Sequence, residues 1–389
     1  MIFCDSYLPG HRGGGGMWAV RNVAARFSER YDIFIVTRDC DGKIDSTPYV
    51  KIPRNRWTER PEATVYYASP SDLNSKTFAR LTEEIGPHAI YLNSVFSKVC
   101  TRLLFAQRRL RNRQIPLLIA PCGELAAAAI HLKYFRKRMF LFFAQAFGLF
   151  RFATWKAASI EESNDIKRVI SVDVKISVAP ELTPRDILPG FTTEEKPKKV
   201  PGSVRLSYLS RVTRIKNLHY LLELLNVIDA VSIRLEVIGP ADDDRYLEKC
   251  RQIADSLPSN IDVDFIGGVD HESALARVKE SHFMVLPTSS ENFGYAIIES
   301  MAAGCPVVLS DRVAWSDVTE NNAGWRIPLE DREAWLKQLA ECVSMGHEEY
   351  LRFSSSARNF AVKYLLVDGP TTENQLMFDS VLELPYLKG

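Results

Sequence analysis

The stretch HFMVLPTSSENFGYAIIESMAAGCPVVLS, residues 282–310, contains the pattern that decides the fold. It begins with an apolar run at 283–287 and ends with another at 305–309, and each has the length of a buried strand. Between them, residues 294–304 have the apolar spacing of a helix that stops at a Gly-Cys-Pro turn. A strand, a helix and a second strand in this order predict a parallel sheet covered by helices.

The same alternation runs through most of the chain, in two series. The predicted strands lie at 1–4, 32–37, 63–68, 88–93 and 115–120, and then at 204–209, 232–238, 261–267, 283–287 and 305–309. The predicted helices lie near 17–30, 71–85, 97–113 and 133–148, and then near 217–229, 244–256, 271–281, 294–304 and 330–345. We therefore expect an α/β fold of two doubly wound, Rossmann-like domains.

A proline-rich stretch separates the two series. Residues 180–202 hold five prolines and two glycines, and no periodic apolar pattern continues through them. We expect an N-terminal domain over 1–185, a linker over 186–202 and a C-terminal domain over 203–366. Residues 367–389 are expected to form a C-terminal helix, for which packing back on the N-terminal domain is one arrangement. Two such domains leave a ligand cleft at the carboxyl ends of their strands.

Length and composition predict a globular protein. The chain has 389 residues, of which 46% are hydrophobic and 25% charged, which suits about two domains. Its seven cysteines lie far apart without zinc-ligand spacing, which favours a reduced, cytoplasmic compartment. The first residues lack the features of a secretory signal, and the apolar run at 139–150 is too short to span a bilayer.

The two halves of the chain carry opposite net charge. Residues 1–190 contain 28 Lys and Arg against 18 Asp and Glu, whereas residues 191–389 contain 21 against 30. Basic residues in the first half are either solvated helix faces or a surface for an anionic membrane or a lipid diphosphate. We expect peripheral attachment at the cytoplasmic leaflet. The residues concerned are Arg102, Arg108, Arg109, Arg111, Arg113, Lys133, Arg136, Lys137 and Arg138.

The helix start within the opening stretch has the features of a phosphate site. A helix N-terminus offers backbone N–H groups and partial positive charge. The N–H groups concerned are those of Asn292, Phe293, Gly294 and Tyr295. Glu291, just before the helix, can accept hydrogen bonds from two sugar hydroxyls. Glu299, inside the helix, can bind a ribose diol in the same way, or it is an ordinary exposed helix residue.

A turn at the start of the second series supplies two cations. The segment LSRVTRIKNLHYLLELL, residues 209–225, places Arg211 and Lys216-Asn217 between a predicted strand and its helix. By themselves these are surface residues as readily as ligands. As ligands, two fixed cations in a dry cleft would stabilise negative charge, such as that of a phosphate group.

Two segments of the first series add further candidates. The glycine run in SYLPGHRGGGGMW, residues 6–18, permits a concave row of N–H groups around an anion or a sugar, and Gly14 and Gly15 are the candidate contacts. Glycine loops also occur without a ligand. Glu124, in APCGEL, is a candidate contact for donor or acceptor hydroxyls or, alternatively, a helix-capping carboxylate.

Together these segments resemble the family-4 retaining glycosyltransferases of the GT-B fold, of the bacterial polysaccharide and lipopolysaccharide type. The resemblance rests on the E-x7-E spacing from Glu291 to Glu299, with NFG after the first glutamate, and on Arg211 with Lys216. It implies that Glu291 contacts the donor sugar, that the helix start holds the distal phosphate, and that Glu299 holds the ribose. Arg211 and Lys216 would stabilise the departing diphosphate, and Gly14-Gly15 would line the cleft.

The resemblance implies a metal-independent enzyme without a cofactor, which uses a UDP- or GDP-sugar donor and a glycan or lipid-linked glycan acceptor. No aromatic-basic pattern of nucleic-acid binding accompanies the charge. Relatives often have Arg or His where this chain has Cys122, so the acceptor-side group differs. The run 242–244, three aspartates, resembles a manganese site, but its place before a helix favours capping. The alternatives are an epimerase or phosphorylase of the same fold, or a non-catalytic scaffold that binds sugar nucleotides.

Overall fold

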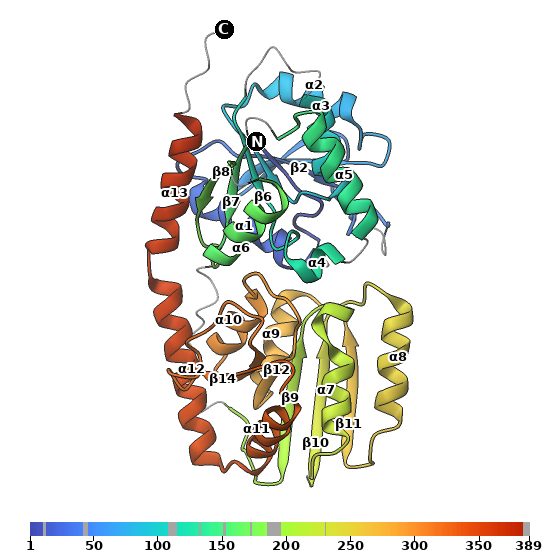
Figure 1. Cartoon of the computed structure of the whole chain (residues 1–389), viewed down its shortest axis with the longest axis vertical. Helices are drawn as coiled ribbons and strands as arrows, with labels where there is room; N and C mark the ends of the chain where they lie inside the picture. The colour runs from blue at the N-terminus through green and yellow to red at the C-terminus, as the bar shows by residue number, and fades with distance from the viewer. Residues whose placement is uncertain are drawn as a thin grey trace. The chain divides into compact units, whose positions relative to one another are not determined.

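A computed structural model of the chain describes residues 1–10, 13–41, 46–107, 115–131, 134–150, 153–171, 173–184, 196–229 and 231–383. The chain forms two compact units (Figure 1). Unit 1 comprises Met1–Thr183 and Asp368–Gly389, and unit 2 comprises Pro184–Val367. Each unit has its own sheet with helices packed around it, which confirms the predicted α/β fold of two doubly wound domains.

Unit 1 is built on an eight-stranded sheet in the order β3-β4-β2-β1-β5-β6-β7-β8. The strands are β1 (Ile2–Phe3), β2 (Phe34–Arg38), β3 (Trp57–Arg60), β4 (Ala63–Ala68), β5 (Ile90–Asn93), β6 (Leu117–Ala120), β7 (Ala153–Ala157) and β8 (Lys175–Val178). All neighbours are parallel except β3, which pairs antiparallel with β4. The sequence pattern missed β3, β7 and β8. In β7 a buried lysine, Lys156, interrupts the apolar run by which a central strand is identified.

The helices of unit 1 are α1 (Gly14–Phe27), α2 (Ser75–Ile85), α3 (Lys98–Gln107), α4 (Ala127–His131), α5 (Tyr134–Ala146), α6 (Ile160–Val169) and α13 (Gly369–Leu382). Helix α13 comes from the far end of the chain and packs on this unit. Its Phe378 ring lies 5.4 Å from that of Phe27, and its Asp379 accepts hydrogen bonds from Arg30 and Tyr31. The C-terminal helix therefore contributes to the core of unit 1.

Unit 2 contains a parallel sheet of six strands in the order β11-β10-β9-β12-β13-β14. The strands are β9 (Ser203–Leu209), β10 (Ser232–Ile238), β11 (Ile261–Gly267), β12 (Phe283–Leu286), β13 (Val307–Ser310) and β14 (Gly324–Ile327). Numbered within the unit this order is 3-2-1-4-5-6, which reverses direction between β9 and β12. Such a switch point opens a crevice at the carboxyl ends of the strands, where doubly wound domains bind ligands.

The helices of unit 2 are α7 (Leu218–Leu225), α8 (Asp244–Asp255), α9 (His271–Lys279), α10 (Tyr295–Ala302), α11 (Arg332–Ser344) and α12 (His347–Leu366), with a short 3-10 helix, η3, at Arg214–Lys216. The sequence pattern missed β14 and α12. In the part of the chain that the structure describes, no helix is long and apolar enough to cross a membrane.

Part of the stretch predicted as a linker packs within unit 2. Lys199 is buried, and its ammonium donates to the carbonyls of Val343, at 2.8 Å, and Met345, at 3.1 Å. Lys196 is also buried and donates to two carbonyls at the end of α9. Lysines near the carboxyl ends of helices complement the helix dipole. Residues 186–195 of the predicted linker lie outside the described residues.

Candidate functional site

Lys216 and Glu291 meet at the switch point of unit 2. Lys216 ends η3, which follows β9, and Glu291 lies in the loop after β12. The Lys216 ammonium lies 2.6 Å from Glu291 Oε2 and 3.2 Å from the Ser290 carbonyl. The two side chains are 13% and 19% exposed, so solvent or a ligand can reach them.

The two loops are joined by hydrogen bonds to a single carbonyl. The Ile215 carbonyl accepts from the Ser289 N–H at 2.7 Å and from the Ser289 hydroxyl at 2.8 Å. The Thr288 hydroxyl donates to the same oxygen at 3.2 Å. These contacts hold Lys216 beside the loop that carries Glu291. Sequence reasoning missed Thr288 and Ser289; a signal was present, because hydroxyl residues directly follow a buried strand at the predicted ligand edge.

Both helices that start beside this switch point begin at a residue with a left-handed backbone. Asn217 precedes α7 with a φ of 55°, and Gly294 precedes α10 with a φ of 82°. Only glycine and, less readily, asparagine adopt this region at low cost, which explains a Lys-Asn pair at 216–217. A Cβ at Gly294 would also lie 2.7 Å from Ile297 Cδ1, so the Ile297 side chain would have to shift to admit it.

These helix starts also lack side-chain caps. Neither Asn217 nor Gly294 makes a side-chain capping bond, whereas α8, α9 and α11 are capped by Asp243, Asp270 and Asp331. The first N–H groups of a helix have no intrahelical partner. At α7 the His219 N–H donates to the Tyr246 hydroxyl at 3.4 Å, whereas α10 begins without a side-chain cap, which is the arrangement that suits an anion.

The aromatic residues at the start of α10 are structural. Phe293 and Tyr295 are each 7% exposed, and the Phe293 ring lies 5.2 Å from that of Trp315. The Trp315 indole donates to the Phe293 carbonyl at 2.6 Å. This packing fixes the backbone at Asn292 and Gly294, so it is the main chain, and not these side chains, that can contact a ligand.

Arg211 forms an ion pair with Asp242, which follows β10. The two side chains are 48% and 36% exposed. The loops after β9 and β10 approach closely because Gly239 has no side chain: a Cβ there would lie 2.2 Å from the Ser210 carbonyl. Among the described residues, no hydrogen bond or ion pair joins Arg211 to the pair formed by Lys216 and Glu291. Of the three aspartates, Asp243 is the helix cap, and the role of Asp242 as an arginine partner was missed.

Glu299 lies inside α10 and is 6% exposed at its side chain. Its Oε1 is 3.0 Å from Nε2 of His271, the first residue of α9. A ribose diol at this carboxylate would therefore have to share it with the imidazole. Sequence reasoning missed His271, because nothing in the local pattern indicates that α9 and α10 are neighbours.

The glycine run of unit 1 forms a helix start. Helix α1 begins at Gly14, which has a φ of 59°, so Gly14 and Gly15 belong to its first turn and not to an open loop. No side chain caps this helix. A Cβ at Gly13 would lie 2.2 Å from the Ser6 hydroxyl, which explains one glycine by close packing.

Glu124 is occupied by hydrogen bonds within unit 1. Its carboxylate accepts from the Ser94 hydroxyl at 2.8 Å and from the N–H groups of Val95, at 2.7 Å, and Phe96, at 3.2 Å. Burial raises the pKa of Glu124, and these bonds oppose the rise. The contacts match the capping alternative, since they close the turn before α3. The preceding turn is also held: Cys122 has a φ of 51°, and the Gly123 N–H donates to Glu162 at 2.6 Å.

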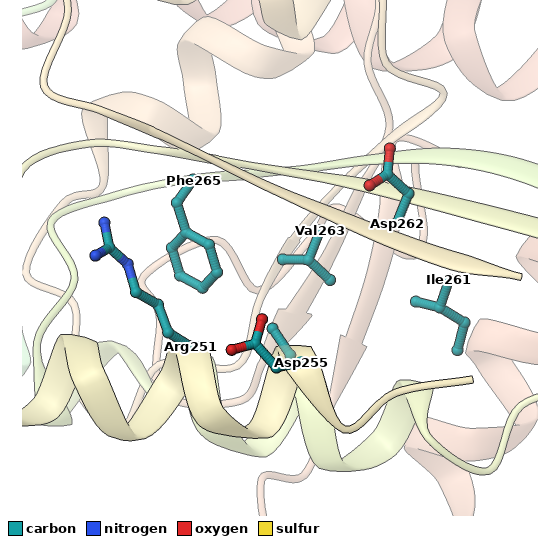
Figure 2. A pocket seen from close by; sticks show the side chains of 7 residues that line it. Arg251, Asp255, Ile261, Asp262, Val263 and Phe265 are labelled. Atoms are coloured by element: carbon teal, nitrogen blue, oxygen red, sulfur yellow. The ribbon is translucent and has the colours of Figure 1, made fainter. Parts of the chain in front are cut away.

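A groove of about 400 Å³ lies elsewhere in unit 2, between α8 and the edge strand β11 (Figure 2). Arg251 stands 5.7 Å from the centre of the Phe265 ring, and Asp255 and Asp262 line the same groove. None of its lining residues is a predicted site residue. Charged side chains on an edge strand discourage pairing with another chain, which accounts for this surface without a ligand.

Comparisons with known proteins find relatives for much of unit 2. Residues 191–360 match the family described as glycosyl transferases group 1. The chain is 24% identical over 174 residues to D-inositol 3-phosphate glycosyltransferase of Corynebacterium urealyticum, which covers 42% of this chain and 41% of that protein. It is 27% identical over 128 residues to phosphatidyl-myo-inositol mannosyltransferase of Mycolicibacterium smegmatis, covering 32% of this chain and 31% of the relative. The matched part thus spans less than half of either relative.

The fold has solved counterparts over almost its full length. The structure of HepE from Anabaena in complex with UDP and glucose superimposes with a TM-score of 0.69 at 16% identity, covering 98% of this chain and 99% of that one. At this identity the likeness shows the fold, which is the GT-B arrangement of two doubly wound domains.

Proposed function

Because residues 191–360 match the family described as glycosyl transferases group 1, we propose that this chain is a retaining glycosyltransferase. It moves a sugar from a UDP- or GDP-sugar to a hydroxyl of a glycan or lipid-linked glycan. The setting is bacterial cell-surface polysaccharide or lipopolysaccharide synthesis. The observation that carries the proposal is the pairing of Lys216 with Glu291 beside the uncapped start of α10.

The diphosphate of the donor binds where Lys216 and Arg211 lie near the start of α10, which has no side-chain cap. A lysine ammonium has three N–H donors, and two acceptors among the described residues, Ser290 O and Glu291 Oε2, occupy two of them. The third can bind a phosphate oxygen. Arg211 has five N–H donors, so it can keep Asp242 and still bind phosphate. Glu291 orients the donor sugar through its hydroxyls, and Glu299 with His271 holds the ribose.

In the proposed reaction the acceptor oxygen bonds to the anomeric carbon while the bond from that carbon to the diphosphate oxygen breaks. The bonding electrons leave with the nucleoside diphosphate, whose added charge Lys216 and Arg211 neutralise. The acceptor proton passes to an oxygen of the departing phosphate on the same face, so no protein base is needed and the anomeric configuration is kept. The enzyme works without a metal, because fixed cations and helix starts supply the positive charge.

The acceptor is the least constrained part of the proposal. Two relatives are named for phosphoinositol acceptors, one of them a lipid, which supports a phosphate-bearing or lipid-linked acceptor here. Peripheral attachment to an anionic membrane belongs to the same proposal. Its support is the sequence, where ten basic residues lie between 98 and 138 with Glu124 as the sole acidic residue.

Thermal shift with UDP- and GDP-sugars tests donor binding directly. We expect one donor to stabilise the full chain, by about 2.7 kcal/mol at a hundredfold excess over its Kd. Lys216→Ala should abolish the shift, and Lys198→Ala, at an exposed lysine of the same unit, should keep it. An unchanged thermal shift in Lys216→Ala would show that the donor does not bind at Lys216 and Glu291. NMR of the product anomer then distinguishes retention from inversion.

Turnover of the donor separates the alternatives. An epimerase converts the donor sugar without any acceptor, and a phosphorylase needs inorganic phosphate as co-substrate. A scaffold binds the donor and transfers nothing to any acceptor, and Cys122, where relatives often have Arg or His, is the feature in its favour. Transfer that requires a glycan or lipid acceptor supports the glycosyltransferase.

A further inference from the structure

Helix α5 presents large apolar side chains to solvent. Phe135 is 75% exposed, Phe142 64%, Phe143 45% and Met139 40%. Their positions recur every three or four residues, so they form one stripe along the helix. On a surface helix the outward face is normally polar and the apolar face is covered. In α5 the outward face is apolar as well, while Leu141 and Ala144 pack into the core of unit 1.

Among the described residues, exposed aromatic side chains are concentrated at α5. Their exposed large aromatic side chains all lie on α5 or at the residue directly after it: Tyr134, Phe135, Phe142, Phe143 and Phe147. Single exposed apolar residues are normal on a protein surface, but a contiguous group of this kind marks an interaction site.

The charges around the stripe are of one sign. Arg136 and Arg138 are exposed on the same helix, and α5 contains no acidic residue. Glu124 is the sole acidic residue in the sequence from 98 to 146, and its carboxylate is turned inward to Ser94 and the turn before α3. Lys137 donates to the Ala129 carbonyl at 2.8 Å and lies 4.7 Å from the centre of the Phe96 ring, which ties the helix to the unit.

We propose that α5 is a membrane-contact helix that inserts its apolar stripe, residues 135, 139, 142 and 143, into the surface of an anionic bilayer. Aromatic residues suit the headgroup boundary, and arginines beside them attract anionic lipid. With 13 residues at about 1.5 Å each, α5 is much shorter than the ~30 Å hydrocarbon core, so it lies along the surface. A second copy of the chain fits less well, because it would bring Arg136 and Arg138 close to their own counterparts.

This surface deepens the proposed function, and rests on it only for the identity of the acceptor. Helices α4 and α5 directly follow β6, and the turn between β6 and α4 carries Cys122 and Glu124 at the carboxyl edge of the sheet. A bilayer at α5 would therefore bring a lipid-linked acceptor close to this edge of unit 1. Residues 108–114 and 132–133, with five of the basic residues predicted for this surface, lie outside the described residues.

Vesicle flotation of the full chain tests the proposal. We expect binding to vesicles of equal parts phosphatidylcholine and phosphatidylglycerol, weaker binding at high salt, and little binding to phosphatidylcholine alone. The double variant Phe135→Ser/Phe142→Ser should lose at least about tenfold in affinity, because two buried aromatic rings are removed from the membrane. Leu376→Ser, at a residue 64% exposed on α13 of the same unit, is the matched control and should bind normally.

Charge is tested in the same way. Arg136→Glu/Arg138→Glu should lose at least about tenfold on anionic vesicles. The control Lys76→Glu/Lys167→Glu reverses two exposed lysines on other helices of unit 1 and should lose much less. Equal losses in both charge variants, or no preference for anionic vesicles, would overturn the proposal. So would dimerisation of the chain that Phe135→Ser abolishes, since a second copy would then cover the stripe.

The outcome is independent of catalysis. A chain that floats with vesicles and binds no nucleotide sugar keeps the membrane surface and removes the proposed enzyme. A chain that binds a nucleotide sugar but does not bind vesicles keeps the proposed enzyme and removes the membrane surface. Near-UV circular dichroism of each variant establishes that it is folded, so a loss of binding reports the surface.

Discussion

The parallel strands β4-β2-β1-β5-β6-β7 of unit 1 follow the same order as the six strands of unit 2, but the carboxyl edges of the two sheets use their charged residues differently. In unit 2, Lys216 and Glu291 are 13% and 19% exposed. In unit 1, Lys156 and Glu181 lie 2.8 Å apart and are only 2% and 5% exposed. A buried pair cannot release one partner to a ligand without a large desolvation penalty, whereas a partly exposed pair exchanges partners at low cost.

The comparison teaches that one topology can supply two kinds of edge. In unit 1 the acidic residues near β6 and β7 are saturated within the protein: Glu124 accepts from the turn before α3, and Glu162 accepts from Gly123 and Ala158. In unit 2 the start of α10 has no side-chain cap, and Lys216 beside it is partly exposed. The first edge is a rigid platform, and the second is ready for an anionic ligand.

The largest effect is expected from breaking the buried pair. Lys156→Met removes the ammonium that neutralises the buried Glu181 carboxylate, which should lower the free energy of unfolding of unit 1 by about 3–5 kcal/mol. Urea denaturation measures it. The double variant Lys156→Met/Glu181→Leu removes both charges and should recover most of the loss. A loss below about 1 kcal/mol in the single variant would mean that the two edges do not differ as described.

Removing the partly exposed Lys216 should affect the proposed reaction and spare the fold. Lys216→Ala takes away a donor to the departing diphosphate and should lower kcat roughly 10²–10³-fold. Its free energy of unfolding should change by no more than about 1 kcal/mol, since both partners are partly solvated. Steady-state transfer kinetics and urea denaturation provide the two readouts, with Lys198→Ala as the control. Equal kcat values would contradict the proposed role.

Gly294→Ala sharpens the comparison at the helix start. The new Cβ would lie 2.7 Å from Ile297 Cδ1 and 3.0 Å from Glu291 Cγ, on a backbone with a φ of 82°. We expect unit 2 to lose about 1–3 kcal/mol and donor affinity to fall about tenfold. Gly346→Ala is the control, because that glycine has an ordinary φ of −81° and open space around it. Calorimetric titration with the donor measures the affinity. An unchanged Kd in Gly294→Ala would show that the backbone at the start of α10 does not contact the donor.

The smallest effect is expected at the exposed arginine pair. Asp242→Asn removes the carboxylate that shares Arg211, so donor affinity should rise about two- to threefold, with almost no change in stability. The control is Asp264→Asn, which breaks a similarly exposed ion pair between Asp264 on β11 and Arg234 on β10. It should leave donor affinity unchanged. A weaker donor complex in Asp242→Asn would show that Asp242 positions Arg211 for the phosphate instead of competing for it.

Much of the fold could be predicted because its signals are local. The apolar runs of β9, β10, β12 and β13, and the helices between them, follow from periodicity alone. The elements that were missed have polar interruptions or weak patterns, as with Lys156 in β7. For the site, the residue types and their place after strands were predicted, and the structure brings Lys216 to Glu291 although 75 positions separate them. Their roles with a donor stay predictions.

What the sequence determined by itself is the alternation of strands and helices, the glycine and asparagine positions that start α7 and α10, and the residue types at the carboxyl edges, since periodicity and turn chemistry act between near neighbours in the chain. Only the tertiary structure decided which partners these residues have. Asp242 reaches Arg211 because β10 lies beside β9, and His271 reaches Glu299 because α9 packs on α10. The tertiary structure also decided that the α5 stripe is exposed, because whether an apolar face is covered depends on which elements pack against it.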